Sequence, residues 1–386
     1  MRTAAIVGIG TTPYRRRGSS PVSAEGLILQ AALAACADAG LDPKQLDGFV
    51  SYANDLNEGL VIAADLGVDE VRWSTLVWGG GGGGVAAAVN MAAAAVRAGE
   101  AEAVLVYRGI TEADDGRQSY GKGHFGPLLS ANGLLAPAQI CALRTQRLIE
   151  VDGVPPEAIE AIALASYAHA QRNPDAVAYG RPLDEEQYAE SRMISEPLRL
   201  YDCSRENDGA AAVIVTSAER ARDLRSIPAH IRSGVQGAGR GWAESGENED
   251  AYTSAGFHPA MVRRLYDGAG IGPADIDVVQ LYENFTGPAV ASLIDLGLCP
   301  TGAEAAKVLT VDNLTAPDGD LPINTAGGNL AEGFVHGIGL VLEAVRQVRG
   351  TSPSQVPDVR YSLMVGGPMA PLVSAFILSP EPGGRS

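Results

Sequence analysis

A run of six glycines at residues 79–84 is the feature of this sequence most able to support chemistry. It follows a β-rich stretch at residues 74–78 and leads into an alanine-rich stretch at residues 85–97, a pattern that predicts a strand, a tight turn and a helix. Backbone N–H groups at such a turn, together with the helix N-terminus, stabilise negative charge. The run contains no Ser, Cys, Thr or Lys, so it offers an oxyanion site without a nucleophile.

Tyr282 is the residue we predict to act as a base or proton relay beside this glycine run. A phenol has a pKa near ~10 in water, so it needs a donor, a cation or a proton chain to accept a proton at neutral pH. His336 and Tyr252 are the candidates to assist it. The alternative is that Tyr282 is a buried strand tyrosine with a bonded hydroxyl and that His336 is a polar residue at a helix start. We interpret Glu283 as structural, bonding the backbone of a loop.

Other groups that could carry chemistry form weaker patterns. The four cysteines are scattered without a CxxC spacing, and the five histidines show no metal-ligand pairing, so we predict no metal site. We also predict no covalently bound cofactor. The glycine run lacks the lysine of a phosphate-binding P-loop. Cys203 lies near two aspartates, but its segment is more typical of a structural element than of a nucleophile.

Composition limits the class of protein. The chain has 386 residues and a formal net charge of −17, which argues against nucleic-acid binding and against anionic membranes. It contains no signal peptide and no apolar run near the ~18 residues of a transmembrane helix, so we expect a cytoplasmic, soluble protein. A chain of this length suggests two domains or two equivalent halves.

The sequence repeats itself. The segment at residues 39–54 and the segment at residues 269–284 share Ala, Gly, Pro, Asp, Tyr and Asn in register, and each predicts a helix end, a loop and a buried strand. We therefore predict an α/β fold with mostly parallel strands. The predicted halves are residues 1–225 and 226–386. The first half carries an inserted region at residues 110–199, predicted to be helical at residues 139–151 and 156–173.

Several motifs in this order resemble the thiolase superfamily. They are the glycine run, Tyr282-Glu-Asn-Phe285, Asn324-Thr-Ala-Gly-Gly328, Gly333-Phe-Val-His-Gly337 and Met364-Val-Gly-Gly-Pro368. Pro197-Leu-Arg-Leu-Tyr-Asp-Cys203 and Asp208-Gly-Ala210 resemble the sterol-carrier-protein-x, or lipid-transfer-protein, branch. The resemblance covers nearly the whole chain. It implies two pseudo-equivalent β-α-β-α halves in a five-layer α-β-α-β-α fold, a homodimer and an acyl-CoA substrate.

The positions that differ from thiolases are the reactive ones. The nucleophilic cysteine of the family would fall among Gly81, Gly82 and Gly83, and its catalytic histidine corresponds to Phe334. Its second catalytic cysteine corresponds to Met364, and the residue that opens its Asn-Glu-Ala-Phe motif corresponds to Tyr282. A covalent acyl-enzyme is therefore excluded. From the resemblance we expect oxyanion or substrate contacts from the residues Gly81, Gly82, Gly83, Phe334, Met364, Gly366 and Gly367.

The cysteine-less steroid side-chain aldolases of this branch resemble the chain most in these positions. They cleave a 17-hydroxy-steroid side-chain CoA thioester to a ketosteroid and propionyl-CoA, together with a small partner that carries an OB fold. The resemblance implies the same lyase reaction here, with Tyr282 and His336 as catalytic residues and CoA entering only as part of the substrate. Two alternatives stay open: a catalytically silent subunit that binds acyl-CoA, and an acyltransferase.

Overall fold

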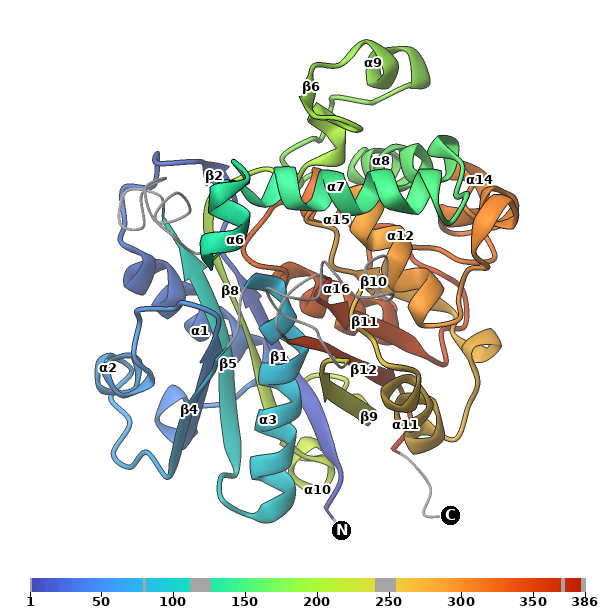
Figure 1. The fold of residues 1–386 in the computed structure, drawn as a ribbon. Helices are drawn as coiled ribbons and strands as arrows, with labels where there is room; N and C mark the ends of the chain where they lie inside the picture. The colour runs from blue at the N-terminus through green and yellow to red at the C-terminus, as the bar shows by residue number, and fades with distance from the viewer. Residues whose placement is uncertain (1, 79–80, 112–125, 240–254, 369–371, 383–386) are drawn as a thin grey trace.

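The computed structural model describes residues 2–78, 81–111, 126–239, 255–368 and 372–382 (Figure 1). Within residues 126–128 only the backbone is described. No helix in these ranges is both long and apolar enough to cross a lipid bilayer.

Nine strands form one hydrogen-bonded path, which consists of two similar sets. The N-terminal set runs in the order β4 (Trp73–Val77), β3 (Gly48–Tyr52), β5 (Ala103–Ile110), β8 (Asn207–Ser217) and β1 (Ala4–Thr11). The C-terminal set continues with β9 (Ala229–Gly237), β12 (Val373–Ser379), β11 (Ser362–Gly366) and β10 (Val278–Leu281). The sets meet where Ala5 and Ile6 of β1 pair with β9.

The strand directions confirm the duplication. In the first set β3 is parallel to β5, while β8 is antiparallel to both of its neighbours, β5 and β1. In the second set β10 is parallel to β11, while β12 is antiparallel to β11 and β9. A parallel bridge between Val279 and Ile323 takes the place that the β3–β4 pairing has in the first set.

The prediction of mostly parallel strands was wrong. Strand β8 begins at the end of the sheet where β5 stops, since Ile110 pairs with Gly209. The long insertion therefore returns the chain to the same end of the sheet, and β8 runs antiparallel to β5. Strand β12 returns beside β11 in the same way, with Gly366 paired to Ser374.

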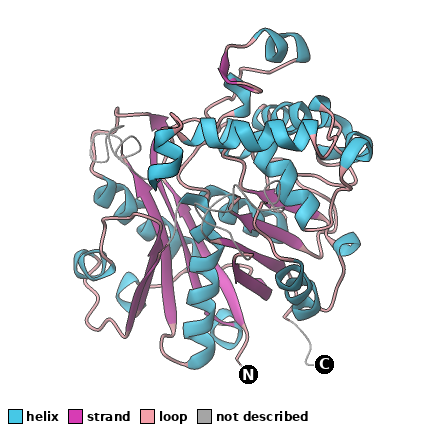
Figure 2. Cartoon of the chain, viewed as in Figure 1, coloured by secondary structure: helices cyan, strands magenta, loops and turns pink. Residues whose placement is uncertain are grey.

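Helices cover the sheet sets on their outer faces and separate them in the middle (Figures 1 and 2). Successive residues of β1 show this directly. Ala5 and Val7 pack with the helices α1 (Ala24–Ala39) and α2 (Gly59–Asp65), whereas Ala4 and Ile6 face the opposite side. That opposite side is a central core built around α3 (Gly84–Ala98) and α16 (Ile338–Arg349). Because α3 is buried on nearly all sides, it consists largely of alanine, which permits close packing.

The outer face of the C-terminal set is covered by α11 (Pro259–Ala269), α12 (Thr286–Asp295) and α8 (Pro156–Ala170). The layers are thus α-β-α-β-α, as the resemblance implies. Shorter helices complete the fold: α10 (Ala218–Ala221), α13 (Ala305–Val308), α14 (Val311–Leu314) and α15 (Gly328–Ala331).

The inserted region contains the two predicted helices. They are α7 (Pro137–Glu150) and α8, and both pack against α12 of the C-terminal half. The insertion also contains the helices α6 (Gly126–Ala131) and α9 (Glu185–Glu190) and the strands β6 (Met193–Ser195) and β7 (Leu198–Arg199). Strands β6 and β7 form a separate hairpin that projects from the body with α9 (Figure 1), and β2 (Arg15–Arg16) pairs with β8.

Candidate active site

The described part of the glycine run forms a turn that leads into a helix, as predicted. Residues Gly81–Gly83 make a single 3₁₀ turn that leads into α3, while Gly79 and Gly80 lie outside the described residues. The turn is fixed to the β11–β12 connection, because the carbonyl of Gly82 accepts a hydrogen bond from the N–H of Gly367 at 3.1 Å. A Cβ on Gly366 would lie 2.9 Å from the same carbonyl. The structure therefore brings two of the predicted glycine segments together, and we call them the glycine cradle.

Tyr282 lies directly against this cradle. It follows β10, and its backbone N–H donates to the carbonyl of Val365 at 2.9 Å. A Cβ on Gly82 would lie 1.8 Å from Cε2 of the Tyr282 ring, and one on Gly337 would lie 2.4 Å from Cδ2. A Cβ on Gly81 would lie 3.9 Å from the hydroxyl oxygen. The ring thus fits only because these neighbours are glycines, and it places the phenol at the turn.

His336 stands at the start of α16 in a rare backbone conformation. Its φ is +46°, and Gly337 after it also has a positive φ of 81°. Such a conformation in a non-glycine residue is strained and recurs at functional sites. The Tyr52 hydroxyl donates to the carbonyl of His336 at 2.8 Å, and Nε of Arg108 donates to its Nδ1 at 3.2 Å. Burial first, and then the charge of Arg108, hold the imidazole pKa well below its ordinary value, so the ring is neutral.

Phe334 lies between these two side chains. Its ring centroid is 6.2 Å from that of Tyr282 and 5.4 Å from that of His336, edge-on in both cases. Met364 in β11 is completely buried in the same central core. Substrate contacts from Phe334 and Met364 therefore stay predictions, and Tyr252 lies outside the described residues.

Glu283 makes the structural bond that the sequence suggested. Its carboxylate accepts hydrogen bonds from the backbone N–H of Leu330 at 3.3 Å and from the amide of Asn329 at 3.1 Å. A Cβ on Gly328 would lie 1.9 Å from Oε1 of Glu283. Burial raises the pKa of Glu283 well above its ordinary value. The residue next to Tyr282 thus ties β10 to α15.

The sequence interpretation missed the charged group behind His336. Arg108 is 2% exposed in β5, with Nη1 3.1 Å from the carboxylate of Asp55 and Nη2 donating to Oδ1 of Asn54 at 3.1 Å. One signal was present in the sequence, since Arg108 is the single charge in an otherwise apolar buried strand. Arginine is almost never buried unless it is paired.

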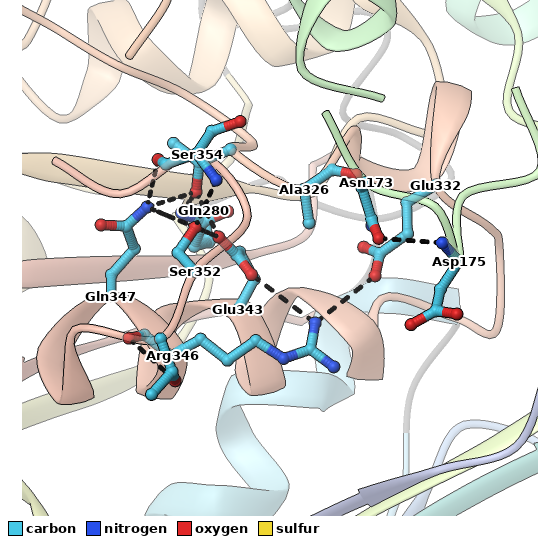
Figure 3. A network of polar contacts seen from close by, with 12 residues as sticks. Asn173, Asp175, Gln280, Ala326, Glu332, Glu343, Arg346, Gln347, Ser352 and Ser354 are labelled. Atoms are coloured by element: carbon cyan, nitrogen blue, oxygen red, sulfur yellow. Dashed lines mark hydrogen bonds and ion pairs between the residues drawn. The ribbon is translucent and has the colours of Figure 1, made fainter. Parts of the chain in front are cut away.

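A second buried network supports the segment that carries His336 (Figure 3). Arg346 lies between two carboxylates, with Nη1 3.6 Å from Glu332 and 3.6 Å from Glu343. Glu343 also accepts a hydrogen bond from Thr325 at 2.6 Å. One cation cannot fully compensate two buried carboxylates, and burial is the main cause that raises the pKa of Glu332 to about 8. The network joins α15 to α16 on either side of the His336 loop.

This network predicts a pH-dependent stability. Because the folded pKa of Glu332 lies above its unfolded value, folding takes up a proton between pH 4.5 and about 8, and stability falls as pH rises through that window. In the wild type we expect the free energy of unfolding to fall by about 2 kcal/mol from pH 6 to pH 8 because of Glu332, and Glu332→Gln should abolish this fall. Urea unfolding of both proteins at the two pH values measures this difference. Glu304→Gln, at an exposed carboxylate, is the control and should keep the wild-type slope; equal slopes for wild type and Glu332→Gln would contradict the prediction.

The four cysteines of the chain are poor nucleophiles at neutral pH. Cys36, Cys141 and Cys299 are buried, Cys203 is partly buried, and burial raises the pKa of each thiol to about 12. Hardly any thiolate exists at neutral pH. Among the described residues, no three His, Cys, Asp or Glu side chains are grouped so that they could hold a metal ion.

We therefore expect thiol alkylation to leave catalysis intact. After treatment with iodoacetamide at pH 7.5, turnover should stay within about twofold of the untreated enzyme, because no reactive thiol takes part. Mass spectrometry of the intact chain counts the modified sites. A loss of activity in proportion to alkylation of one cysteine would contradict this expectation.

Several known proteins resemble this chain in sequence and in fold. Residues 242–379 match the family model described as thiolase C-terminal domain-like. The chain is 36% identical over 400 residues to the 17-hydroxy-3-oxo-4-pregnene-20-carboxyl-CoA lyase of Mycobacterium tuberculosis, which covers 97% of this chain and 98% of that protein. It is also 36% identical over 401 residues to the steroid side-chain-cleaving aldolase of Thermomonospora curvata, which covers 98% of each.

A solved structure extends the likeness to three dimensions. The structure titled Ltp2-ChsH2(DUF35) aldolase superposes with a TM-score of 0.89 at 37% identity, and the match covers 98% of this chain and 97% of that chain. Similarity along the whole length, in sequence and in fold, shows that this chain belongs to the thiolase superfamily, in the lipid-transfer-protein branch that includes the steroid side-chain-cleaving aldolases.

Proposed function

We propose that the chain is a carbon–carbon lyase, a retro-aldolase, that cleaves a β-hydroxyacyl-CoA without forming a covalent acyl-enzyme. The observation that carries the proposal is the position of the Tyr282 ring, enclosed between Gly82 and Gly337 in the glycine cradle. We assign the oxyanion donors of the reaction to this cradle, which also holds the phenol of Tyr282, while burial raises the pKa of each thiol of the chain to about 12. The names of the two relatives support a 17-hydroxy-steroid side-chain CoA thioester as the substrate.

The reaction needs one base and one oxyanion site. Tyr282, in its phenolate form, takes the proton of the hydroxyl group on the β-carbon and becomes a phenol, and that C–O bond becomes a carbonyl. The bond between the β-carbon and the α-carbon breaks, and its electrons pass to the thioester as an enolate. Preorganised donors at the enolate oxygen contribute roughly 3–4 kcal/mol each. Return of the proton to the α-carbon releases propionyl-CoA and a 17-ketosteroid, so atoms and charges balance and no nucleophile is used.

His336 serves this reaction as a neutral hydrogen-bonding group. Its pKa, held well below the ordinary value by burial and by Arg108, makes it a poor proton acceptor at neutral pH. The glycine N–H groups and the imidazole are therefore assigned to the developing enolate, and Tyr282 to the proton. This division of roles is part of the proposal.

The experiment is a turnover assay on the purified chain with a 17-hydroxy-steroid side-chain CoA thioester. Formation of propionyl-CoA and ketosteroid in equal amounts supports the lyase. Binding of the thioester without cleavage of any β-hydroxyacyl-CoA would support a silent acyl-CoA-binding subunit. That alternative is favoured by Phe334, an apolar group beside Tyr282, and by the burial of Tyr282 and His336, which are 3% and 5% exposed. Transfer of the acyl group to a second acceptor would support an acyltransferase.

We also propose that the lyase works with a small partner that has an OB fold. The solved relative, an Ltp2-ChsH2(DUF35) aldolase, supports a partner protein, and the OB fold of that partner is what the family resemblance implies. The assay is therefore run with and without such a partner. We retain the cytoplasmic location as a prediction from the sequence.

Strand β4 supports the proposed homodimer. It pairs with β3 along one edge and with no other described strand, and it ends beside Trp78, which is 82% exposed. Leu76 and Leu56 nearby are also exposed. An open apolar edge invites pairing with a second chain, and a two-fold axis closes such a pair. We propose that two copies join through β4.

Charged residues on this edge should separate the copies. We expect Leu76→Glu with Trp78→Glu to shift the molar mass, measured by light scattering after gel filtration, from twice 39.9 kDa to 39.9 kDa. The like charges would face each other across the two-fold axis. Leu143→Glu, at an exposed leucine on α7, is the control. A double variant that keeps the doubled mass would place the interface elsewhere.

A further inference from the structure

Arg108 makes a contact with His336 that is informative because arginine can only donate hydrogen bonds. Its Nε lies 3.2 Å from Nδ1 of His336, and both side chains are buried. A guanidinium stays protonated in proteins and has no acceptor atom. Nδ1 of His336 must therefore present its lone pair to Arg108, because a proton on Nδ1 would face the N–H of the guanidinium. In a neutral ring the proton then resides on Nε2.

The guanidinium is itself held in place from the N-terminal half. Asp55, whose side chain is 1% exposed, lies 3.1 Å from Nη1, and Asn54 accepts a hydrogen bond from Nη2 at 3.1 Å. Asp55 also accepts a hydrogen bond from the backbone N–H of Asn57 at 2.9 Å. The planar fork of arginine has its three donor nitrogens directed at three different acceptors, so its orientation toward His336 is fixed.

We propose that Arg108 is a positioning residue that holds His336 in the neutral Nε2–H tautomer, so that His336 donates a hydrogen bond to the thioester oxygen and does not act as the base. This inference rests on the proposed function for the identity of the oxygen that receives the bond. The tautomer itself follows from the contacts of the free protein. Tyr282 then remains the proton acceptor. The tautomer of His336, which lies in the C-terminal half, is set by Arg108 on β5 of the N-terminal half.

The groups around His336 agree with this assignment. Arg108 on β5 is the cation that faces the ring, and its charge is compensated by Asp55. Tyr52 on β3 bonds only the His336 carbonyl among the contacts described here, and Phe334 offers an apolar ring edge. Burial and the Arg108 charge both lower the imidazole pKa, which disfavours the doubly protonated ring.

Nitrogen NMR of the full-length chain tests the tautomer without any substrate. The chain has five histidines, so ¹⁵N-histidine labelling gives few signals, and His336→Asn identifies the one from His336. We expect an Nε2-protonated neutral ring that does not titrate between pH 5.5 and 8. An Nδ1-protonated ring, or an imidazolium at pH 7, would overturn the inference.

The variants are chosen to avoid an unpaired buried charge. Arg108→Met alone would leave Asp55 buried without its partner, so the main variant combines Arg108→Met with Asp55→Asn. We expect its His336 signal to show mixed tautomers, with an imidazole pKa that rises relative to wild type but stays below the ordinary value of ~6.5, because the ring remains buried. Arg108→Gln with Asp55→Asn keeps one donor toward Nδ1 and should restore part of the Nε2–H population. Arg97→Met, at a partly buried arginine at the end of α3, is the control and should leave His336 unchanged. An unchanged tautomer in the main variant would show that Arg108 is not responsible.

Steady-state kinetics with the steroid CoA thioester connect the tautomer to catalysis. Loss of the contact between Arg108 and His336 should lower kcat about 10- to 100-fold and change KM less than about threefold, because the hydrogen bond from His336 stabilises mainly the enolate. A main variant with mixed tautomers and full kcat would overturn the donor role. The two proposals can be told apart. If the NMR result is as expected but the wild-type chain cleaves no thioester, the lyase function and the donor role of His336 are wrong. The control of the His336 tautomer by Arg108 would still be supported.

Discussion

Tyr282→Phe is expected to lower kcat by about 10³-fold, with KM within about threefold of wild type. The change removes one oxygen atom and keeps the ring that fills the space between Gly82 and Gly337. The fold and the binding of the thioester should therefore be retained, while the hydroxyl proton of the substrate loses its acceptor. Release of propionyl-CoA, measured at saturating substrate, is the readout.

A matched control separates this effect from the loss of any buried hydroxyl. Tyr266 is also a buried tyrosine, and its hydroxyl donates to the carbonyl of Leu296 at 2.9 Å, outside the glycine cradle. Tyr266→Phe should keep wild-type kcat even if the protein becomes less stable. If Tyr282→Phe retains kcat within about threefold, the phenol takes no part in proton transfer, and the proposed roles must be reassigned.

Gly82→Ala is the second change for which we expect a large effect. A methyl group there would lie 1.8 to 2.3 Å from three atoms of the Tyr282 ring, far inside van der Waals contact, so the ring or the turn must move. A displacement near 1 Å at a reacting group costs about 10²-fold in rate, and overpacking of a tight core costs about 1–3 kcal/mol of stability. Kinetics and urea unfolding of the variant measure the two losses.

Two further variants test whether the clash with the Tyr282 ring causes these losses. Gly272→Ala introduces a methyl group with only an ordinary contact, 3.8 Å from Asp275, and should change neither quantity by much. If the clash with Tyr282 causes the destabilisation, Gly82→Ala should cost less stability in a Tyr282→Ala background, where the ring is absent. Equal costs in the two backgrounds would place the clash elsewhere.

The sequence predicted those parts of the site that lie in short continuous motifs. The glycine turn could be recognised because a β-rich stretch, a glycine run and an alanine-rich helix follow each other directly. Tyr282 and His336 could be named because each belongs to a motif with a fixed place in the family order. The proximity of Tyr282 to Gly82 and Gly337 depends on the pairing of β10 with β11, which the sequence did not predict.

The missed features depend on contacts between elements that are distant in the sequence. Arg108 and His336 are separated by 228 residues, and neither neighbourhood contains a signal for the other. The network of Glu332, Arg346 and Glu343 requires α15 and α16 to be in their final positions. The direction of β8 was predicted wrongly because the insertion hides the fact that the chain leaves and re-enters the sheet at one end.

The two equivalent tyrosines of the repeat now have different surroundings. Tyr52 ends β3 and donates its hydroxyl to the carbonyl of His336, whereas Tyr282 follows β10 and lies in the glycine cradle. The two halves are therefore not interchangeable. The tyrosine of the first half holds the His336 loop of the second half, so neither half by itself contains all the contacts that shape the site.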